Sequence, residues 1–464
     1  MLFQSQGYVL IFLPLVAAAY YLSARSLVLR QWVLIAASLV FYAWWDWRFL
    51  VLPVAQITVT WALSHAHGRS GLSGFLHAGV VVNLASLGTF KYLNFALVSV
   101  GAAAGIAIPS VSIVLPIGIS FFTFQLISYL VDRMRGQAQL FPFRPFALFI
   151  LLYPHLIAGP IVRHNELIPQ FALDPLREGV SGRIGRGLAI FTMGFAKKVL
   201  LADALAPTVD TLFHAAKLHP LDFGQAWTAI FGFAFQLFLD FSAYTEMAIG
   251  SALIFGLILP ENFRRPYLAS SIADFWRRWH ITLSNFIRDY LFVPLGSSRA
   301  GVLRYIPRGR PRAMSAILVS MSLCGLWHGA GWTYVAWGLW HGVGLVVCAI
   351  WQRVGRPLPD PAGWALTMLF VLASWALFRA DSFSVAGSIL QSLCGLHGLG
   401  GRLDNVGLLI VAAMASTLLP SAHELKDKLQ KPRPALAWAV GALAAYCVLE
   451  VGQGPPLNFI YFQF

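Results

Sequence analysis

Two histidines are the residues of this chain best suited to catalysis. His280 lies in the run FWRRWH, and His328 lies in CGLWHGAGW at the end of an apolar stretch over 313–328. A histidine can take a proton from a hydroxyl near neutral pH, and acyl transfer needs such a base. It also needs donors for the developing oxyanion, and His280 or an adjacent indole N–H could orient the reacting groups. The alternative is that each histidine only bridges two helices by hydrogen bonds.

Other candidate groups are weaker. His155, in YPHLIAGP, and His341, in WGLWHG, are expected to be structural. Cys324 precedes His328 by one helical turn, so a Cys–His nucleophile pair is conceivable, although a packing cysteine is the expectation. The cysteines form no CxxC pair, and the chain has no HExxH and no P-loop, so no metal site is predicted.

The composition indicates that these groups are held by a membrane-embedded fold. Of the 464 residues, 58% are hydrophobic and 11% are charged, against roughly 25% charged residues in soluble domains. Apolar stretches of about 15 to 25 residues recur along the chain, which excludes a disordered chain, a coiled coil or an ordinary cytosolic enzyme. We predict an all-α polytopic membrane protein with roughly 11 to 13 transmembrane helices plus re-entrant and amphipathic pieces, forming one domain over 1–464.

Two apolar stretches depart from a simple span. The stretch 145–161 contains Pro154 and Pro160, which favours a broken or re-entrant helix buried in protein. The run 226–258 has 33 residues, so it exceeds a straight span of about 20 and is expected to bend or tilt.

The long run also carries two acids, Asp240 and Glu246. Acids inside a membrane protein could mark a proton or ion path, which would suit a transporter. They are also compatible with buried pairing to Lys197 or Lys198. Pairing is the expectation, and the transport path is kept as an alternative.

The segment 267–295 does not resemble a span. Its apolar residues recur at three- and four-residue spacing, which predicts one amphipathic helix, either at the membrane interface or packed inside the protein beside a wet cavity. Asp274 can pair with Arg277 or Arg278 one turn on. Trp279 and Arg278 beside His280, and Trp327 beside His328, are the candidate substrate-binding residues. The apolar stripe consists of Ile272, Trp276, Trp279, Leu283, Phe286 and Tyr290.

The charge pattern predicts orientation. Lys+Arg 33 minus Asp+Glu 19 gives +14, which in a membrane protein marks cytoplasmic loops. The loop 299–312 has five arginines and no acid, so we expect it in the cytoplasm. No basic soluble face or arm typical of nucleic-acid binding is present, and no nucleic-acid partner is expected.

The position of His328 within its helix indicates its depth. It follows Arg312 by about 24 Å of helix at 1.5 Å per residue, so it should lie well below the cytoplasmic surface. Gly325, Gly329 and Gly331 surround it in the sequence. Small residues leave room either for a substrate chain or for close contact between helices.

The chain resembles the membrane-bound O-acyltransferase (MBOAT) family, and within it the bacterial branch that O-acetylates exported polysaccharides such as alginate. The histidine of the family's Trp–His–Gly motif falls on His328, which implies a catalytic role, and the family's second polar position falls on His280. The branch often has DFSGYSD where this chain reads DFSAYTE. The likeness covers the whole chain, in the stretches 115–132, 153–171, 194–203, 239–267, 274–296, 323–342 and 458–464.

The resemblance implies an O-acetyltransferase of the cell inner membrane. The implied donor is acetyl-CoA, with no bound cofactor, and the acetyl group moves toward an exported polysaccharide. Membrane lipid, the exported-polysaccharide machinery and a soluble extracytoplasmic acetyltransferase are the implied partners. Acylation of a lipid or small alcohol, and a transporter without transferase chemistry, are the alternatives. No inverted internal repeat favouring transport is evident.

Overall fold

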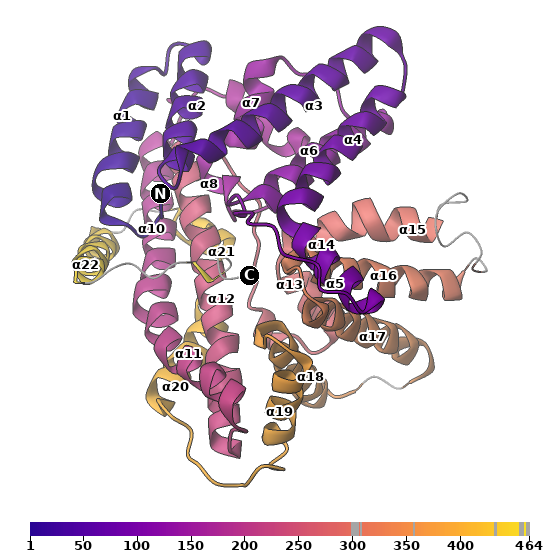
Figure 1. Cartoon of the computed structure of the whole chain (residues 1–464). Coiled ribbons are helices and arrows are strands. Elements are labelled where there is room, and N and C mark those ends of the chain that lie inside the picture. Colours follow the sequence, from indigo (N-terminus) through magenta and orange to yellow (C-terminus); the bar gives the residue numbers. More distant parts are fainter. Residues whose placement is uncertain (298–305, 307–308, 356–357, 431–433, 454–458, 461–464) are drawn as a thin grey trace. The chain divides into compact units, whose positions relative to one another are not determined.

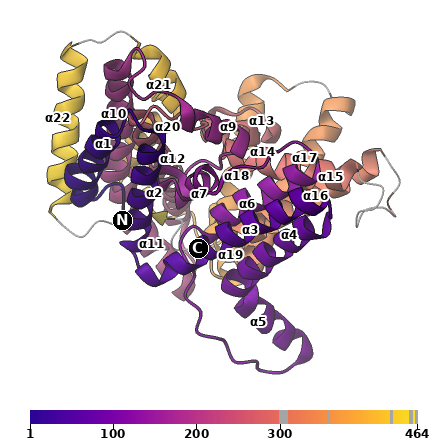
Figure 2. The ribbon, with the colours of Figure 1, turned by 90° about the horizontal axis from the view of Figure 1, so that it is seen from above.

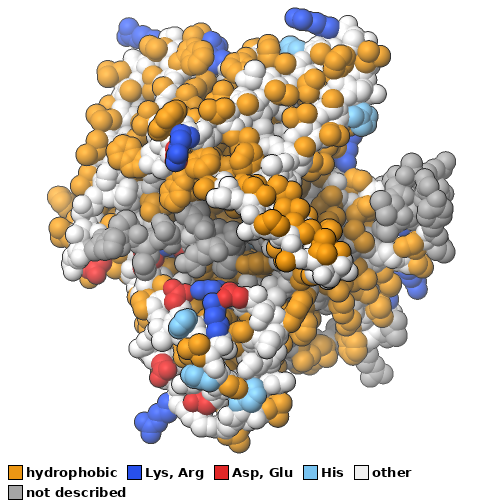
Figure 3. All heavy atoms as spheres, in the orientation of Figure 1, with side chains coloured by type: hydrophobic (Ala, Val, Ile, Leu, Met, Phe, Trp, Pro, Cys, Tyr) orange, Lys and Arg blue, Asp and Glu red, His pale blue; other side chains and the backbone are white. Residues whose placement is uncertain are grey.

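All regular structure in the described residues is helical, as predicted. The structure is a computed structural model, and it describes residues 1–464 except 298–305, 307–308, 356–357, 431–433, 454–458 and 461–464 (Figure 1). Apolar side chains cover much of the face seen in Figure 3, with few charged groups between them. Such a surface is suited to lipid, which offers no hydrogen bonds to polar groups.

Six helices of the described chain are long and apolar enough to cross a membrane, or seven if the bent pair Val406–Leu418 and Ala422–Lys428 is one span. The predicted class of polytopic helical protein is confirmed. The number is lower than the 11 to 13 predicted because several apolar runs form shorter helices. Tyr8–Leu22 and Leu27–Ala43, for example, belong to the apolar helices of 10–17 residues.

The described chain divides into two compact units, each assembled from separate stretches of sequence. The first comprises Met1–Phe195, Tyr244–Pro260 and Leu425–Pro456, and the second comprises Ala196–Ala243, Glu261–Glu424 and Leu457–Phe464. The single domain predicted over 1–464 stays a prediction.

The first unit contains a layer in which α3, α4 and α6 lie side by side (Figure 2). The stretch 145–161 is broken and buried as predicted: α7 ends at Leu151, and α8 begins at Tyr153. The helices of this unit are α1 (Leu13–Leu22), α2 (Leu27–Ala43), α3 (Val51–Ser70), α4 (Gly74–Leu87), α5 (Leu93–Ala104), α6 (Ile119–Met134), α7 (Phe143–Leu151), α8 (Tyr153–Leu156), α9 (His164–Leu167), α10 (Val180–Ala196) and α22 (Pro434–Val451), with short turns η1 (Tyr8–Phe12), η2 (Trp47–Leu50), η3 (Gly88–Tyr92) and η4 (Ile168–Ala172).

The second unit holds the segments that carry both candidate histidines. Its helices are α11 (Asp203–Leu218), α13 (Ile272–Arg278), α14 (Ile281–Ile287), α15 (Val293–Ser297), α16 (Arg310–His328), α17 (Trp332–Val354), α18 (Asp360–Arg379), α19 (Phe383–Leu393) and α20 (Val406–Leu418), with η5 (Lys197–Ala202), η6 (Pro266–Leu268) and η7 (Arg288–Phe292). The short helix α21 (Ala422–Lys428) follows.

Helix α12 (Phe223–Ile254) contributes to both units and is a single unbroken helix of 32 residues. At 1.5 Å per residue it is about 48 Å long, more than the ~30 Å of a bilayer core. The helix is therefore longer than a bilayer core and is not interrupted by a break. Asp240 on this helix lies 3.0 Å from Lys198 Nζ, so the predicted buried pairing is confirmed for that acid.

Most of the basic loop 299–312 lies outside the described residues, and its cytoplasmic location stays a prediction. Of its arginines, Arg310 and Arg312 are described; Arg310 is exposed, and Arg312 is buried. The Arg312 guanidinium donates from Nε and Nη2 to the carbonyl oxygen of Ile306, at 3.1 and 2.7 Å.

Candidate active site

The segment predicted as one amphipathic helix is broken at His280, so that prediction is wrong in this respect. Helix α13 ends at Arg278, and α14 begins at Ile281. His280 has φ 44° and ψ 53°, in the left-handed region, which costs a residue with a side chain about 1–3 kcal/mol.

Backbone pairing with a distant stretch supplies the physical reason for the break. The N–H of Ile281 donates to the carbonyl of Asn262 at 2.9 Å, and the N–H of Arg264 donates to the carbonyl of Arg278 at 2.9 Å. These bonds hold the chain out of the helix at His280. A conformation that a side chain rarely adopts, held in place by its surroundings, is often part of a functional site.

The remainder of the segment follows the predicted pattern. All but Tyr290 of the apolar stripe is buried, whereas Arg277 and Arg288 are exposed, so the segment packs its apolar face against its own unit and presents charged residues at the surface. Asp274 Oδ2 accepts from Arg278 Nε at 2.8 Å, and Arg277 Nη2 lies 3.4 Å from Asp274 Oδ1. The predicted one-turn ion pairs are therefore present.

The side chain of His280 has a defined tautomer. It is fully buried, and its Nδ1 lies 3.0 Å from Asn262 Oδ1. The same oxygen accepts from the Thr282 backbone N–H at 3.3 Å and from the Thr282 hydroxyl at 3.0 Å. Because a backbone N–H can only donate, this Asn262 atom is the acceptor, and His280 Nδ1 carries the proton.

Nε2 of His280 is consequently the ring nitrogen with a lone pair. It is buried and has no hydrogen-bond partner among the described residues. His280 lies outside the candidate spans, and burial lowers its pKa to about 3. The ring is thus a neutral hydrogen-bond acceptor near neutral pH.

His328 is the last residue of α16, at the end of the helix that begins near the basic loop, as predicted. It is 4% exposed and lies in an aromatic surround. Its ring centroid is 4.9 Å from Trp327, 5.2 Å from Trp337 and 5.4 Å from Phe378. The structure places it 6.3 Å from the ring centroid of His280. The two histidines singled out in the sequence therefore share one site within the second unit.

Glycines on both sides of His328 in the sequence serve close contact between helices. A Cβ on Gly325 would lie 2.0 Å from the carbonyl oxygen of Tyr334, and one on Gly338 would lie 2.1 Å from that of Met321. A Cβ on Gly329 would meet the Tyr334 ring at 2.2 Å. Helices α16 and α17 lie side by side as a result (Figure 1). Of the two roles predicted for these glycines, close contact is confirmed for Gly325 and Gly329.

Gly325→Ala is therefore expected to lower the free energy of unfolding by at least about 1–3 kcal/mol, since the added methyl forces the two backbones apart. Thermal unfolding of purified protein in detergent measures this. Gly441→Ala is the matched control, because it lies within α22 with no atom within 4 Å of the added Cβ. Equal melting temperatures for the two variants would show that α16 and α17 are not in close contact.

The other histidines and Cys324 have different surroundings. His341 Nε2 lies 3.0 Å from Ser374 Oγ, and its Nδ1 accepts from Trp276 Nε1 at 3.3 Å, which agrees with the expected structural role. His155 belongs to the first unit, where Gln125 is its partner. Cys324 is buried and lines an apolar cavity, as a packing residue would.

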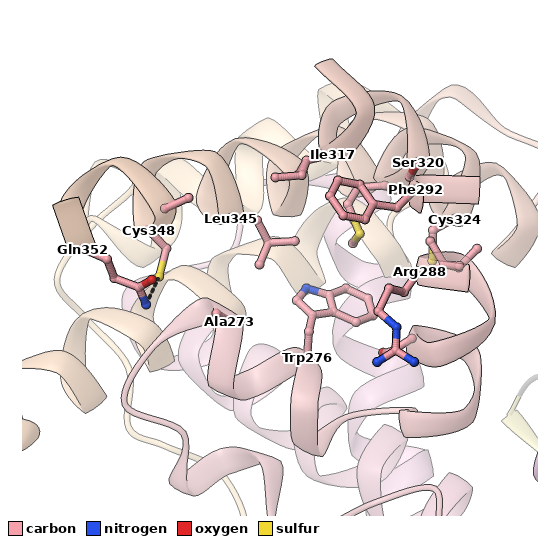
Figure 4. Close-up of a pocket in the computed structure, with 14 residues that line it drawn as sticks. Ala273, Trp276, Arg288, Phe292, Ile317, Ser320, Cys324, Leu345, Cys348 and Gln352 are labelled. Atoms are coloured by element: carbon pink, nitrogen blue, oxygen red, sulfur yellow. Dashed lines mark hydrogen bonds between the residues drawn. The ribbon is translucent and has the colours of Figure 1, made fainter. Parts of the chain in front are cut away.

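That cavity, of about 350 Å³, lies between α13, α14, α16, α17 and η7 (Figure 4). Trp276, Arg288, Cys324 and Leu345 are among its lining residues. A second pocket, of about 510 Å³, shares Ala273, Trp276, Ser284 and Arg288 with it. The second pocket is basic, with Arg264, Arg277, Arg278 and Arg288 against Asp274.

The predicted substrate-binding residues fall into two environments. Arg278 lines the basic pocket. Trp279 is buried and stacks on Phe275 at 5.5 Å, and Trp327 is buried 6.1 Å from the His280 ring. In the described residues no group of three or more His, Cys, Asp or Glu is arranged to hold a metal.

Two residues of the site were missed in the sequence. Asn262, which sets the His280 tautomer, lies inside the stretch 239–267 that carries the family likeness, but no local pattern marks it. Trp337 packs against His328, and its buried Nε1 has no hydrogen-bond partner among the described residues. Its only signal is its place in the aromatic run after His328.

The fold and the site define a multi-pass helical membrane protein with a buried histidine pair beside a basic pocket. Residues 32–386 match the membrane-bound O-acyltransferase family, MBOAT, and the chain belongs to this family. It is therefore an O-acyltransferase of the cell inner membrane, as predicted, and the alternative of a non-catalytic transporter is set aside.

Similar proteins come from several bacteria. The chain is 39% identical to the probable alginate O-acetylase AlgI of Azotobacter vinelandii over 397 residues, which cover 83% of this chain and 76% of that protein. It is 36% identical to the AlgI of Pseudomonas putida over 457 residues, covering 94% and 89%. It is also 35% identical to the peptidoglycan O-acetyltransferase of Helicobacter pylori over 437 residues, covering 86% and 81%.

Proposed function

We propose that this protein moves acetyl groups from acetyl-CoA in the cytoplasm toward hydroxyls of an exported polysaccharide such as alginate. His328 acts as the catalytic base, and His280 is the second catalytic residue. The observation that supports this most strongly is the pair of buried imidazoles with ring centroids 6.3 Å apart. A hydroxyl group bound between the rings can contact both.

The chemistry is an acyl transfer between a thioester and a hydroxyl. The hydroxyl oxygen attacks the thioester carbonyl carbon, a C–O bond forms, and the C–S bond breaks. The hydroxyl proton passes to the imidazole of His328 and from there to the departing thiolate. His280 orients the acceptor, its Nε2 accepting from a neighbouring sugar hydroxyl because the reacting hydroxyl gives its single proton to His328. The Trp337 indole N–H is a buried donor available to the oxyanion.

The two adjoining pockets support acetyl-CoA as the donor. Arginine is the side chain best matched to phosphate groups because its planar fork donates two parallel hydrogen bonds. The basic pocket contains four arginines and one acid, and Arg288 also lines the apolar cavity. The phosphates of the donor would lie in the basic pocket, and its thioester arm would enter the apolar cavity toward the helix that carries His328.

The acceptor is proposed from the relatives. The similar proteins are named as O-acetylating enzymes of alginate or of peptidoglycan, and both polymers contain carbohydrate. A soluble acetyltransferase outside the cytoplasm would complete the modification as part of the polysaccharide machinery, with membrane lipid around the protein. The choice of alginate over another polymer is the most specific part of this proposal.

The test is acetyl transfer by the purified protein in lipid vesicles, with labelled acetyl-CoA on one side and polysaccharide plus partner on the other. Arg288→Gln is expected to raise the KM for acetyl-CoA about tenfold with little change in kcat, since one charged hydrogen bond to phosphate is lost. Arg402→Gln removes an exposed arginine of the same unit and serves as the control. Transfer of long acyl chains to lipid, with acetyl-CoA inactive, would favour the lipid acyltransferase alternative.

A further inference from the structure

Two residues from the C-terminal end of the chain are buried in the second unit. Phe459 is fully buried, and Ile460 is 2% exposed. The backbone N–H of Ile460 donates to Asp240 Oδ2 at 2.8 Å, and the Phe459 ring packs against Phe241 with centroids 5.7 Å apart. A segment more than 200 residues away in sequence is thus held on α12 by a charged group.

Asp240 belongs to a buried ionic cluster. Its side chain is 3% exposed, and its Oδ1 lies 3.0 Å from Lys198 Nζ, which also lies 2.7 Å from Asp203 Oδ1. Buried charges are costly unless each has partners. Lys198 forms the ion pair at Asp240 Oδ1, and the Ile460 N–H donates to Oδ2. Lys198 belongs to η5, a π-helical turn of the kind often found at functional sites.

A continuous set of contacts leads from this cluster to the proposed catalytic pair. Phe241 follows Asp240 on α12, and its ring meets the His280 ring edge-on, with centroids 4.8 Å apart. Phe459 packs on the same Phe241 ring. An ion pair between Lys198 and Asp240 would form without the hydrogen bond to Ile460. Lys198 and Asp240 also have no part in the chemistry proposed above.

We infer that Asp240, oriented by Lys198, docks Phe459 and Ile460 so that Phe459 holds Phe241 against His280. Asp240 is thereby a positioning residue for His280. This inference rests on the proposed function, because it assigns the role of the contacts around a catalytic histidine. Removing the docking bond should leave substrate binding intact but misalign the ring that must meet the hydroxyl.

The sharpest variant is Ile460→Pro, which removes the N–H donor and changes no charge. We expect kcat for acetyl transfer to fall about tenfold with the KM for acetyl-CoA unchanged within about twofold. Ile460→Val keeps the N–H and should match the wild type. Asp240→Asn should lower kcat in the same way. The variant that carries both Ile460→Pro and Asp240→Asn should be no slower than the slower single variant, since both substitutions act on the same hydrogen bond.

Asp203→Asn is the control for the ionic cluster, because it removes a carboxylate from Lys198 and leaves the Asp240–Ile460 bond in place. It should keep the wild-type kcat. The inference would be overturned if Ile460→Pro kept the wild-type kcat, or if Asp203→Asn and Asp240→Asn lowered kcat equally. The ionic cluster would then only stabilise the fold. Failure of the proposed function gives a different result from failure of this inference, because the wild-type protein would then show no acetyl transfer that depends on His328.

Discussion

His328→Gln is expected to lower acetyl transfer by at least about 10², because it removes the titratable nitrogen that accepts the hydroxyl proton. Glutamine has nearly the same length and keeps some hydrogen bonding. The aromatic contacts with Trp327, Trp337 and Phe378 lose only part of a ring. The assay is acetyl-CoA turnover by purified protein, or the acetyl content of the exported polymer.

Membrane abundance and thermal stability of this variant should change little, since a near-isosteric polar replacement leaves no large cavity. His77→Gln, on an exposed position of α4, controls for the substitution itself. An abundant, folded and fully active His328→Gln protein would rule out His328 as the base. The buried pair would then be structural, and another group would have to take the proton.

Local sequence patterns were sufficient where one helix or one break decides the structure. The prolines of 145–161 predicted a buried break, and α7 and α8 are separated there. The helix from Arg312 to His328 is continuous as predicted. An acid inside an apolar run predicted an ion pair, because an isolated charge there is costly, and Asp240 lies 3.0 Å from Lys198.

The same patterns failed where backbone hydrogen bonds to a distant stretch of sequence determine the structure. The apolar stripe of 267–295 is regular, yet the helix stops at His280 because the chain pairs with Asn262 and Arg264. Helical periodicity reports which face is buried and carries no information on such pairing. The glycines near His328 predicted either room for a substrate or close helix contact. Only the contacts with Tyr334 show that α17 occupies the space beside them.

His280→Asn is expected to lower acetyl transfer by about 10²–10⁴, the usual cost of losing a proton-handling or hydrogen-bonding group at the reacting centre. Asparagine is the informative substitution because it tolerates the left-handed conformation that His280 adopts at φ 44°. It therefore removes Nε2 without disturbing the backbone bonds to Asn262 and Arg264. The rate is measured with acetyl-CoA, beside the melting temperature of the same preparation.

His280→Ala is expected to lose the same activity and in addition stability, since alanine tolerates positive φ less well than histidine or asparagine and leaves the space of the buried ring empty. Asn405→Ala separates the two effects, because Asn405 also has positive φ, 51°, at the start of α20 and takes no part in the chemistry. That variant should lose stability and keep kcat. If His280→Asn keeps the wild-type rate, the left-handed residue serves only to turn the chain between α13 and α14. The fixed tautomer and open Nε2 would then have no part in catalysis, and His328 would have to act without a second histidine.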